Sequence, residues 1–245
     1  MKTSKRTVST ILHLLVAAIA AVFVEATFAA DGPRISDAQT AEAAGMVSIQ
    51  SLVPDMRLEM RYASDTNFVG KRVRGYEAAR CYLIKPVAEA LQRVELSLRE
   101  QSMRLKIFDC YRPIRAVQNF VEWAGDLNEQ KTKSRYYPNL EKSDLLGDYI
   151  APTSGHSRGA TVDLTLMRCD VDGQCASLDM GTDFDFFDVL AHTDSPNITP
   201  RQRENRQRLR TAMEKEGFQN YPMEWWHYTF KPEPSKDVAY DFPVR

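Results

Sequence analysis

The stretch Thr153–Leu166, "TSGHSRGATVDLTL", decides how the rest of the chain is interpreted. Its first half is rich in Gly and Ser, as loops are, and its second half alternates between apolar and polar residues. Because side chains on a strand point to opposite faces in turn, this alternation predicts a strand over residues 161–169. One face would carry Val162, Leu164 and Leu166, and the other Thr161, Asp163 and Thr165.

Two of the four histidines stand close to a carboxylate. His156 precedes Asp163 by seven residues, and His227 follows Glu224 by three in "MEWWHYTF". A carboxylate in a strand is unfavourable without a partner, and His156 enters the same strand from its loop. Two His and one carboxylate leave the fourth zinc position free for water, which is the arrangement of a catalytic zinc. On spacing alone, a hydrogen-bonded structural pair is the alternative.

Two further residues could complete such a site. Glu224 lies close to His227 and could act as the base for the water. Arg112, in "DCYRP", follows a predicted buried strand and could stabilise the developing oxyanion.

The hydrophobic pattern predicts an α+β fold. Short strands with helices before or between them favour a single domain with a central, mainly antiparallel sheet and helices packed around it. The expected helices cover residues 85–103, 114–126 and 199–218, and the expected strands cover 55–64, 104–113, 161–169 and 224–230. We expect the enzyme domain to cover residues 46–245, after a flexible segment at 30–45.

Residues 1–29 have the three-part layout of a secretory signal peptide. Lys2, Lys5 and Arg6 precede an apolar run at 11–24, and small residues follow. The run is shorter than the ~18 residues of a membrane-spanning helix, although an uncleaved anchor is the alternative. We expect cleavage after Ala29, export to the periplasm, and no stable membrane association afterwards.

Charge and cysteine content narrow the partners and the compartment. The chain has 32 Lys and Arg against 33 Asp and Glu, and loss of residues 1–29 would leave a net charge of −3. This balance gives no support for nucleic-acid binding, so the expected partner is a small molecule. The sequence does not determine the oligomeric state.

An exported chain with four cysteines is expected to form two disulfides. Cys169 and Cys175 flank an Asp-Gly turn signal, and a hairpin there would pair them. Elimination then leaves Cys81 with Cys110, and four free thiols are the alternative.

Specific motifs add a family resemblance. "SGHSRGATVD" fits S-x-H-x-x-G-x-A-x-D except at Thr161, and "EWWH" fits E-x-W-H. Both resemble the zinc peptidases grouped with lysostaphin, D-Ala-D-Ala carboxypeptidases and the hedgehog signalling domain. The ordered series "FDCYRPIRAVQNF", "SRYYPN", "MGTDFDFFD", "NRQRLRTAMEKEGF" and "YDFPVR" is similar to the D-alanyl-D-alanine dipeptidases of the vancomycin-resistance type. The resemblance runs from about residue 48 to the end of the sequence.

The resemblance implies one Zn²⁺ per chain and a role for each matching residue. The implied metal ligands are His156, Asp163 and His227, the base is Glu224, the transition-state cation is Arg112, the acid for the substrate ammonium group is Asp185, and the pocket-lining residues are Ser154 and Tyr62. Thr161 replaces the usual Ala and could add a hydroxyl near the metal. Many relatives act in the cytoplasm, whereas this chain is expected to be exported.

The implied reaction is hydrolysis of D-Ala-D-Ala to free D-alanine. The alternative is a D,D-carboxypeptidase or endopeptidase that cuts peptidoglycan stem peptides. Asp185 favours the dipeptide, because an acid placed for a free amino terminus disfavours a long acyl chain. A non-catalytic zinc-binding module is a further alternative, which Glu224 and Arg112 argue against.

Overall fold

The computed structural model describes residues 32–245, so the predicted signal peptide lies outside the described residues. Within residues 32–245, six strands form the main sheet, in the order β3-β5-β6-β9-β8 with β7 paired to β6. The β3–β5 pair is parallel and the other pairs are antiparallel, which confirms the predicted α+β class with a mainly antiparallel sheet. The strands are β3 (Arg57–Leu58), β5 (Met103–Asp109), β6 (Thr161–Cys169), β7 (Cys175–Ser177), β8 (Phe218–Asn220) and β9 (His227–Phe230).

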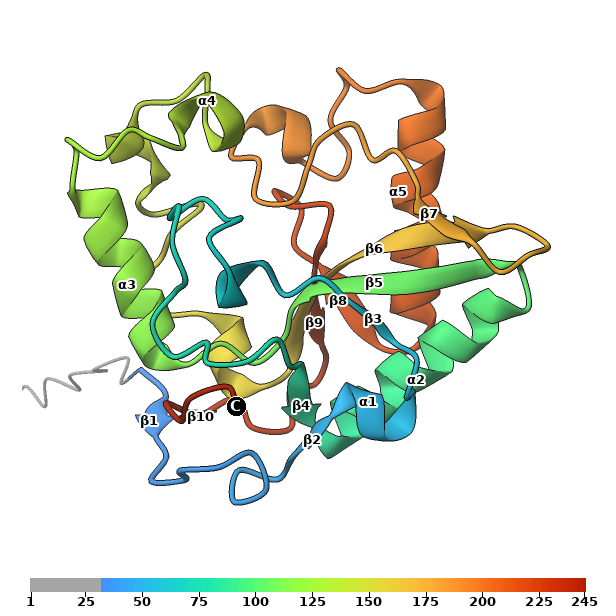
Figure 1. Cartoon of the computed structure of the whole chain (residues 1–245), viewed down its shortest axis with the longest axis horizontal. Helices are drawn as coiled ribbons and strands as arrows, with labels where there is room; N and C mark the ends of the chain where they lie inside the picture. Colours follow the sequence, from blue (N-terminus) through green and yellow to red (C-terminus); the bar gives the residue numbers. More distant parts are fainter. Residues whose placement is uncertain (1–31) are drawn as a thin grey trace, which may run out of the picture. The chain divides into compact units, whose positions relative to one another are not determined.

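Two long helices pack along this sheet. Helix α2 (Lys85–Arg99) contacts β5, helix α5 (Pro200–Lys215) contacts β6 and β8, and the two helices contact each other (Figure 1). Helix α2 buries Val87, Leu91, Val94 and Leu98, which recur at helical spacing. Helix α5 begins at a capping box made by Thr199 and Gln202, with Pro200 in its first turn.

Helix α3 (Ile114–Gly125) and several short helices complete the described part of the chain. Helix α3 follows β5 after a short irregular link, and contacts the 3-10 helix η2 (Lys142–Leu145). The remaining short helices are α1 (Ile49–Leu52), α4 (Lys133–Tyr136) and the 3-10 helices η1 (Arg61–Ala63), η3 (Gly155–Arg158) and η4 (Val189–Ala191). No helix in the described part of the chain is long and apolar enough to cross a membrane.

Two small sheets attach both ends of the described chain to the rest. Strand β2 (Met46–Ser48) pairs with β4 (Tyr82–Ile84), and β1 (Arg34–Ile35) pairs with β10 (Val238–Ala239). Strand β1 lies in the segment expected to be flexible, where Ala41 and Ala44 are also buried. The structure therefore gives residues 34–44 partners that the sequence did not reveal.

Three predicted strands are shorter than expected. The strand predicted at 55–64 is limited to β3, because the chain then turns into η1 and buries Tyr62. The strand predicted at 104–113 ends at Asp109, where the register with β6 shifts. The strand predicted at 224–230 begins at His227, because Glu224–Trp226 form a turn.

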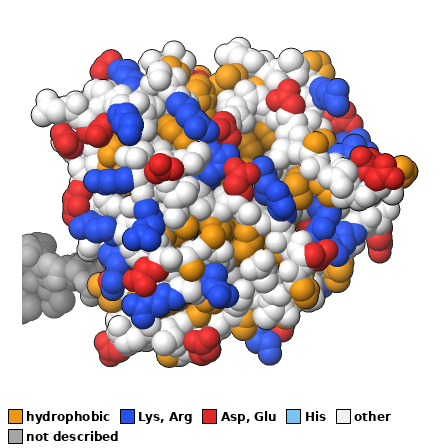
Figure 2. Space-filling model, in the orientation of Figure 1, with side chains coloured by type: hydrophobic (Ala, Val, Ile, Leu, Met, Phe, Trp, Pro, Cys, Tyr) orange, Lys and Arg blue, Asp and Glu red, His pale blue; other side chains and the backbone are white. Residues whose placement is uncertain are grey.

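Both predicted disulfides are confirmed. Cys81 is bonded to Cys110 and Cys169 to Cys175, so no cysteine among residues 32–245 is free. Figure 2 shows acidic and basic side chains interspersed on the face that it presents, with apolar side chains visible between them.

Candidate active site

Three potential metal ligands meet where η3, β6 and β9 come together. Asp163 on β6 lies opposite His227 on β9 in the sheet register, and His156 projects from η3. The Nε2 of His156 lies 3.2 Å from Asp163 Oδ2, and the Nδ1 of His227 lies 3.1 Å from Asp163 Oδ1. One ligand atom from each residue falls within 4.8 Å of the other two.

The chemistry of this cluster fits a zinc ion. Two imidazole nitrogens and a carboxylate oxygen are the donors of three-ligand catalytic zinc sites. Asp163 is buried, and apart from the nearby His227 nitrogen, itself a candidate ligand, its Oδ1 has no hydrogen-bond donor. Such an unsatisfied oxygen is costly unless a cation or other partner meets it.

His156 is held by two contacts on the side away from the cluster. Its Nδ1 is 2.6 Å from the backbone carbonyl oxygen of Cys110, so a proton on Nδ1 leaves Nε2 free to face the cluster. The hydroxyl of Ser154, which caps η3, accepts a hydrogen bond from the His156 backbone N–H at 3.2 Å. Complete burial lowers the pKa of His156 and so favours the neutral ring that a metal requires.

Glu224 reaches the cluster because it shares a turn with His227. The His227 backbone N–H donates to the Glu224 carbonyl oxygen, and the Glu224 Oε2 lies 3.5 Å from His227 Nδ1. Burial raises the pKa of Glu224 to about 7. A carboxyl group with a raised pKa, placed beside the ligands, is suited to accept and return a proton.

Arg112 brings a cation to the opposite side of the cluster. Its Nε donates to Asp109 Oδ2 at 2.9 Å, and its Nη2 lies 3.4 Å from Asp163 Oδ2. The guanidinium also lies over the rings of Tyr62 and Phe120, at 5.2 Å and 5.0 Å from the ring centroids. These contacts fix a charged group that a substrate oxygen can meet.

Asp185 provides a second, separate acidic position. It is only 4% exposed, and its backbone adopts a φ of 61°, a left-handed conformation that is uncommon for a residue other than Gly. The hydroxyl of Tyr62 lies 3.0 Å and 3.1 Å from its two carboxylate oxygens. Burial, reinforced by the negative charge of Asp163, raises the pKa of Asp185 well above its usual range. A cation bound beside Asp185 would relieve this unfavourable burial.

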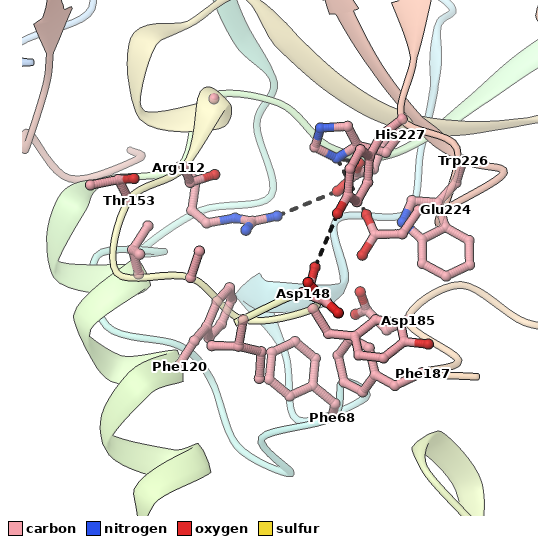
Figure 3. A pocket seen from close by; sticks show the side chains of 18 of the residues that line it. Phe68, Arg112, Phe120, Asp148, Thr153, Asp185, Phe187, Glu224, Trp226 and His227 are labelled. Atoms are coloured by element: carbon pink, nitrogen blue, oxygen red, sulfur yellow. Dashed lines mark hydrogen bonds and ion pairs between the residues drawn. The ribbon is translucent and has the colours of Figure 1, made fainter. Parts of the chain in front are cut away.

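These residues line one cavity of about 310 Å³. Figure 3 shows Arg112, Glu224, Asp185 and His227 around it, with Phe68, Phe120 and Phe187 along one side. Of the eight site residues predicted from sequence, His156 lies buried behind the cavity. The other seven line it: Tyr62, Arg112, Ser154, Asp163, Asp185, Glu224 and His227. The structure therefore brings the predicted set together, while the role of each residue stays a prediction.

Several contributors were not predicted. Asp109, which binds Arg112 and accepts a 2.6 Å hydrogen bond from Tyr76, was signalled only as an acid at the end of a buried strand. The aromatic side of the cavity gave no sequence signal distinct from ordinary core residues. Thr161, which could narrow the site or add a hydroxyl near the metal, has its Oγ1 3.0 Å from Thr229 Oγ1 on β9.

The comparisons with known proteins agree with this geometry. A family model described as D-ala-D-ala dipeptidase, Peptidase_M15, matches residues 42–245. The chain belongs to this family. The family resemblance inferred from the motifs is thereby confirmed, and membership makes the chain a metallopeptidase.

Curated members of the M15 dipeptidase family align over nearly their whole length. A D-alanyl-D-alanine dipeptidase of Enterococcus faecium is 39% identical over 202 residues, which cover 82% of this chain and 98% of that protein. One from Streptomyces coelicolor is 40% identical, covering 80% and 96%. One from Escherichia coli is 30% identical, covering 80% and 90%.

Proposed function

We propose that this chain hydrolyses D-Ala-D-Ala to two molecules of D-alanine, with one Zn²⁺ held by His156, Asp163 and His227. The observation that carries the proposal is the cluster of these three ligands at a cavity that is also lined by Glu224, Arg112 and the separate acid Asp185. The curated relatives of the same family are named D-alanyl-D-alanine dipeptidases, which supports the same substrate.

The residues divide the work of hydrolysis between them. Bound Zn²⁺ would supply a lowered pKa for the attacking water and polarisation of the substrate carbonyl. Glu224 takes a proton from the water and passes it to the leaving nitrogen as the C–N bond breaks. Arg112 stabilises the carbonyl oxygen while it carries negative charge.

Recognition of a dipeptide depends on its charged ends, because it offers few other atoms. Asp185, with Tyr62 bound to its carboxylate, is placed to receive the free ammonium group of the substrate. An acylated amine has no charge and more bulk, so it would lose this ion pair. Ser154 lines the cavity and also holds η3, so we assign it both a pocket and a structural role.

One comparison of substrates tests this function. Protein prepared with Zn²⁺ is incubated with D-Ala-D-Ala, L-Ala-L-Ala, N-acetyl-D-Ala-D-Ala and a pentapeptide that ends in D-Ala-D-Ala. We expect rapid release of D-alanine from the free D,D-dipeptide alone. Cleavage of the acetylated dipeptide or of the pentapeptide at the same rate would favour a D,D-carboxypeptidase instead.

A variant tests the metal assignment. His227→Ala should lose both zinc and activity, because a three-ligand site that loses one donor holds the ion weakly. Metal analysis of the purified variant against the unaltered protein measures this. A full zinc content in His227→Ala would contradict the ligand assignment.

We also propose that the protein is exported to the periplasm. The layout of residues 1–29 supports this, and two disulfides are typical of an oxidising compartment. Cell fractionation and N-terminal sequencing test it, with a mature terminus at Ala30 expected. A full-length protein recovered from the cytoplasm would contradict it.

A further inference from the structure

The Cys81–Cys110 disulfide lies directly behind a proposed metal ligand. The carbonyl oxygen of Cys110 is the group 2.6 Å from His156 Nδ1. Both cysteines are completely buried, and Cys110 follows the last residue of β5. Because β5 ends at Asp109, the sheet ladder does not hold the Cys110 carbonyl in place.

Two adjacent links fix the peptide group that carries this carbonyl. Its C=O belongs to Cys110 and faces His156, while its N–H belongs to Tyr111 and donates to the Tyr82 carbonyl oxygen at 3.0 Å. The disulfide joins the neighbouring pair, Cys81 and Cys110. The hydrogen bond to Tyr82, the first residue of β4, and the disulfide to Cys81, which precedes it, therefore both tie this peptide group to the start of β4.

That strand, β4, also supports the segment that carries His156. The Ile84 backbone N–H donates to the Gly159 carbonyl oxygen at 2.9 Å, one residue after the end of η3. Strand β4 thus contacts both the peptide group whose carbonyl meets His156 and the residue that follows η3. Strand β4 pairs with β2 in a separate small sheet, so the disulfide is a covalent tie between this sheet and the end of β5.

We propose that the Cys81–Cys110 disulfide positions the metal ligand His156 by holding the Cys110 carbonyl that fixes its ring. The inference rests on the proposed function, since it takes His156 as a ligand. Groups that hold a ligating His in this way typically contribute ten- to a hundredfold to metal affinity. Without the disulfide, only non-covalent contacts restrain the peptide group, among them the Tyr111–Tyr82 hydrogen bond and the packing of Tyr111 on Phe242, and the ring is freer to turn away from Asp163.

The second disulfide provides a matched control. Cys169–Cys175 joins β6 to β7 in a hairpin, and Cys169 is six residues along β6 from Asp163. At the rise of an extended strand this is roughly 20 Å. Its loss removes one covalent bond, as does loss of Cys81–Cys110, but touches no group that contacts the ligands.

The experiment compares Cys81→Ala/Cys110→Ala with Cys169→Ala/Cys175→Ala and the unaltered protein. Zinc affinity of each metal-free protein is measured by competition with a chelator, and ¹⁵N NMR of the histidine rings reports the tautomer of His156. We expect about tenfold weaker zinc binding and a mixture of His156 tautomers in the first variant. The second variant should match the unaltered protein in both measurements, whatever it loses in melting temperature.

The outcomes separate the two hypotheses. If the unaltered protein binds no zinc and leaves D-Ala-D-Ala intact, the proposed function is wrong. If it binds zinc and both double variants bind zinc equally tightly, this inference alone is wrong. A further variant, Cys81→Val/Cys110→Ala, refills part of the volume that the lost sulfur atoms leave. If neither this variant nor Cys81→Ala/Cys110→Ala folds, the inference is also overturned, because the disulfide would then serve the whole fold.

Discussion

Glu224 and His227 share one turn but are expected to act differently. Glu224→Gln keeps the shape of the side chain and removes its basicity, so kcat should fall by roughly 10²–10⁴. Zinc should be retained, because Glu224 is not among the three clustered ligands. Steady-state kinetics with metal analysis measure both quantities. Near-normal turnover would exclude Glu224 as the base, and Glu214→Gln on the exposed side of α5 serves as control.

Asp185 is expected to determine the preference for a free amino terminus. Asp185→Asn still offers an oxygen to Tyr62 but carries no charge for the substrate ammonium group. Breaking one side of a buried charge pair costs about 3–5 kcal/mol, which should appear in kcat/KM for D-Ala-D-Ala. The difference from N-acetyl-D-Ala-D-Ala should shrink.

A neighbouring residue supplies the control for Asp185. Asp183 is two residues earlier and pairs with Arg61 and Arg135, but it is half exposed. Asp183→Asn should leave the selectivity for the free dipeptide unchanged. Equal losses in the two variants would show that the loop needs its acids for structure rather than for recognition.

At the scale of elements, the long connection between α3 and η3 depends on a buried lysine. The Nζ of Lys142, on η2, donates to the carbonyl oxygens of Asp126 and Glu129 at 2.8 Å and 2.6 Å. It also lies 3.9 Å from the ring centroid of Trp123. The same connection continues into Gly147–Ala151, which lines the cavity.

Lys142→Met should therefore destabilise the protein. Two carbonyl groups would lose their charged donor, at a cost of about 1–3 kcal/mol in the free energy of unfolding. Urea unfolding measures this, and KM should rise as the wall of the cavity loosens. Lys133→Met is the control, because Lys133 pairs with the exposed Glu141 and should cost at most about 1 kcal/mol. Equal costs would contradict the assigned role of Lys142.

The sequence predicted correctly those helices and strands that are specified by consecutive residues. Strand β6 and the capping box of α5 match their predictions because alternation and end-capping are properties of consecutive residues. The turn at Glu224–Trp226 was missed because its residues, one acid followed by two tryptophans, also suit the start of a strand. Tyr62 was predicted to lie in a strand for the same reason. Its hydrogen bond to Asp185 gave no local signal, because the two residues are 123 positions apart in the sequence.

The candidate site was predicted more completely than the contacts that hold it. The motifs identified the ligands, and the sheet register then explains why Asp163 and His227 meet. The Cys110 carbonyl left no trace in the sequence, since any residue has one. The Asp109–Arg112 contact likewise depends on where β5 ends, which local propensity placed four residues too late.

At the scale of the whole molecule, residues 240–245 form a C-terminal strap across the supports of the site. The Tyr240 N–H donates to the Ser157 carbonyl oxygen of η3, and the Phe242 carbonyl oxygen accepts from the Tyr111 hydroxyl. The Phe242 ring also stacks on Tyr111, at 4.3 Å between centroids. Val244 exchanges hydrogen bonds with the segment beside Tyr76.

Phe242→Ala should test how much the strap contributes. Phe242 is 1% exposed, and replacing a buried Phe by Ala typically costs about 3–5 kcal/mol in the free energy of unfolding. Denaturant unfolding provides the measurement. Arg245→Ala is the control, since the exposed Arg245–Glu77 pair should contribute at most about 1 kcal/mol. A loss for Phe242→Ala no larger than that of the control would mean that the strap is dispensable.

The strap also sets an order of events during synthesis. A ribosome makes residues 240–245 after all the others that support the site. Until they arrive, η3 and Tyr111 lack contacts that hold them in the finished protein. The support of His156 would therefore be complete only once these residues have been made and have packed against η3 and Tyr111.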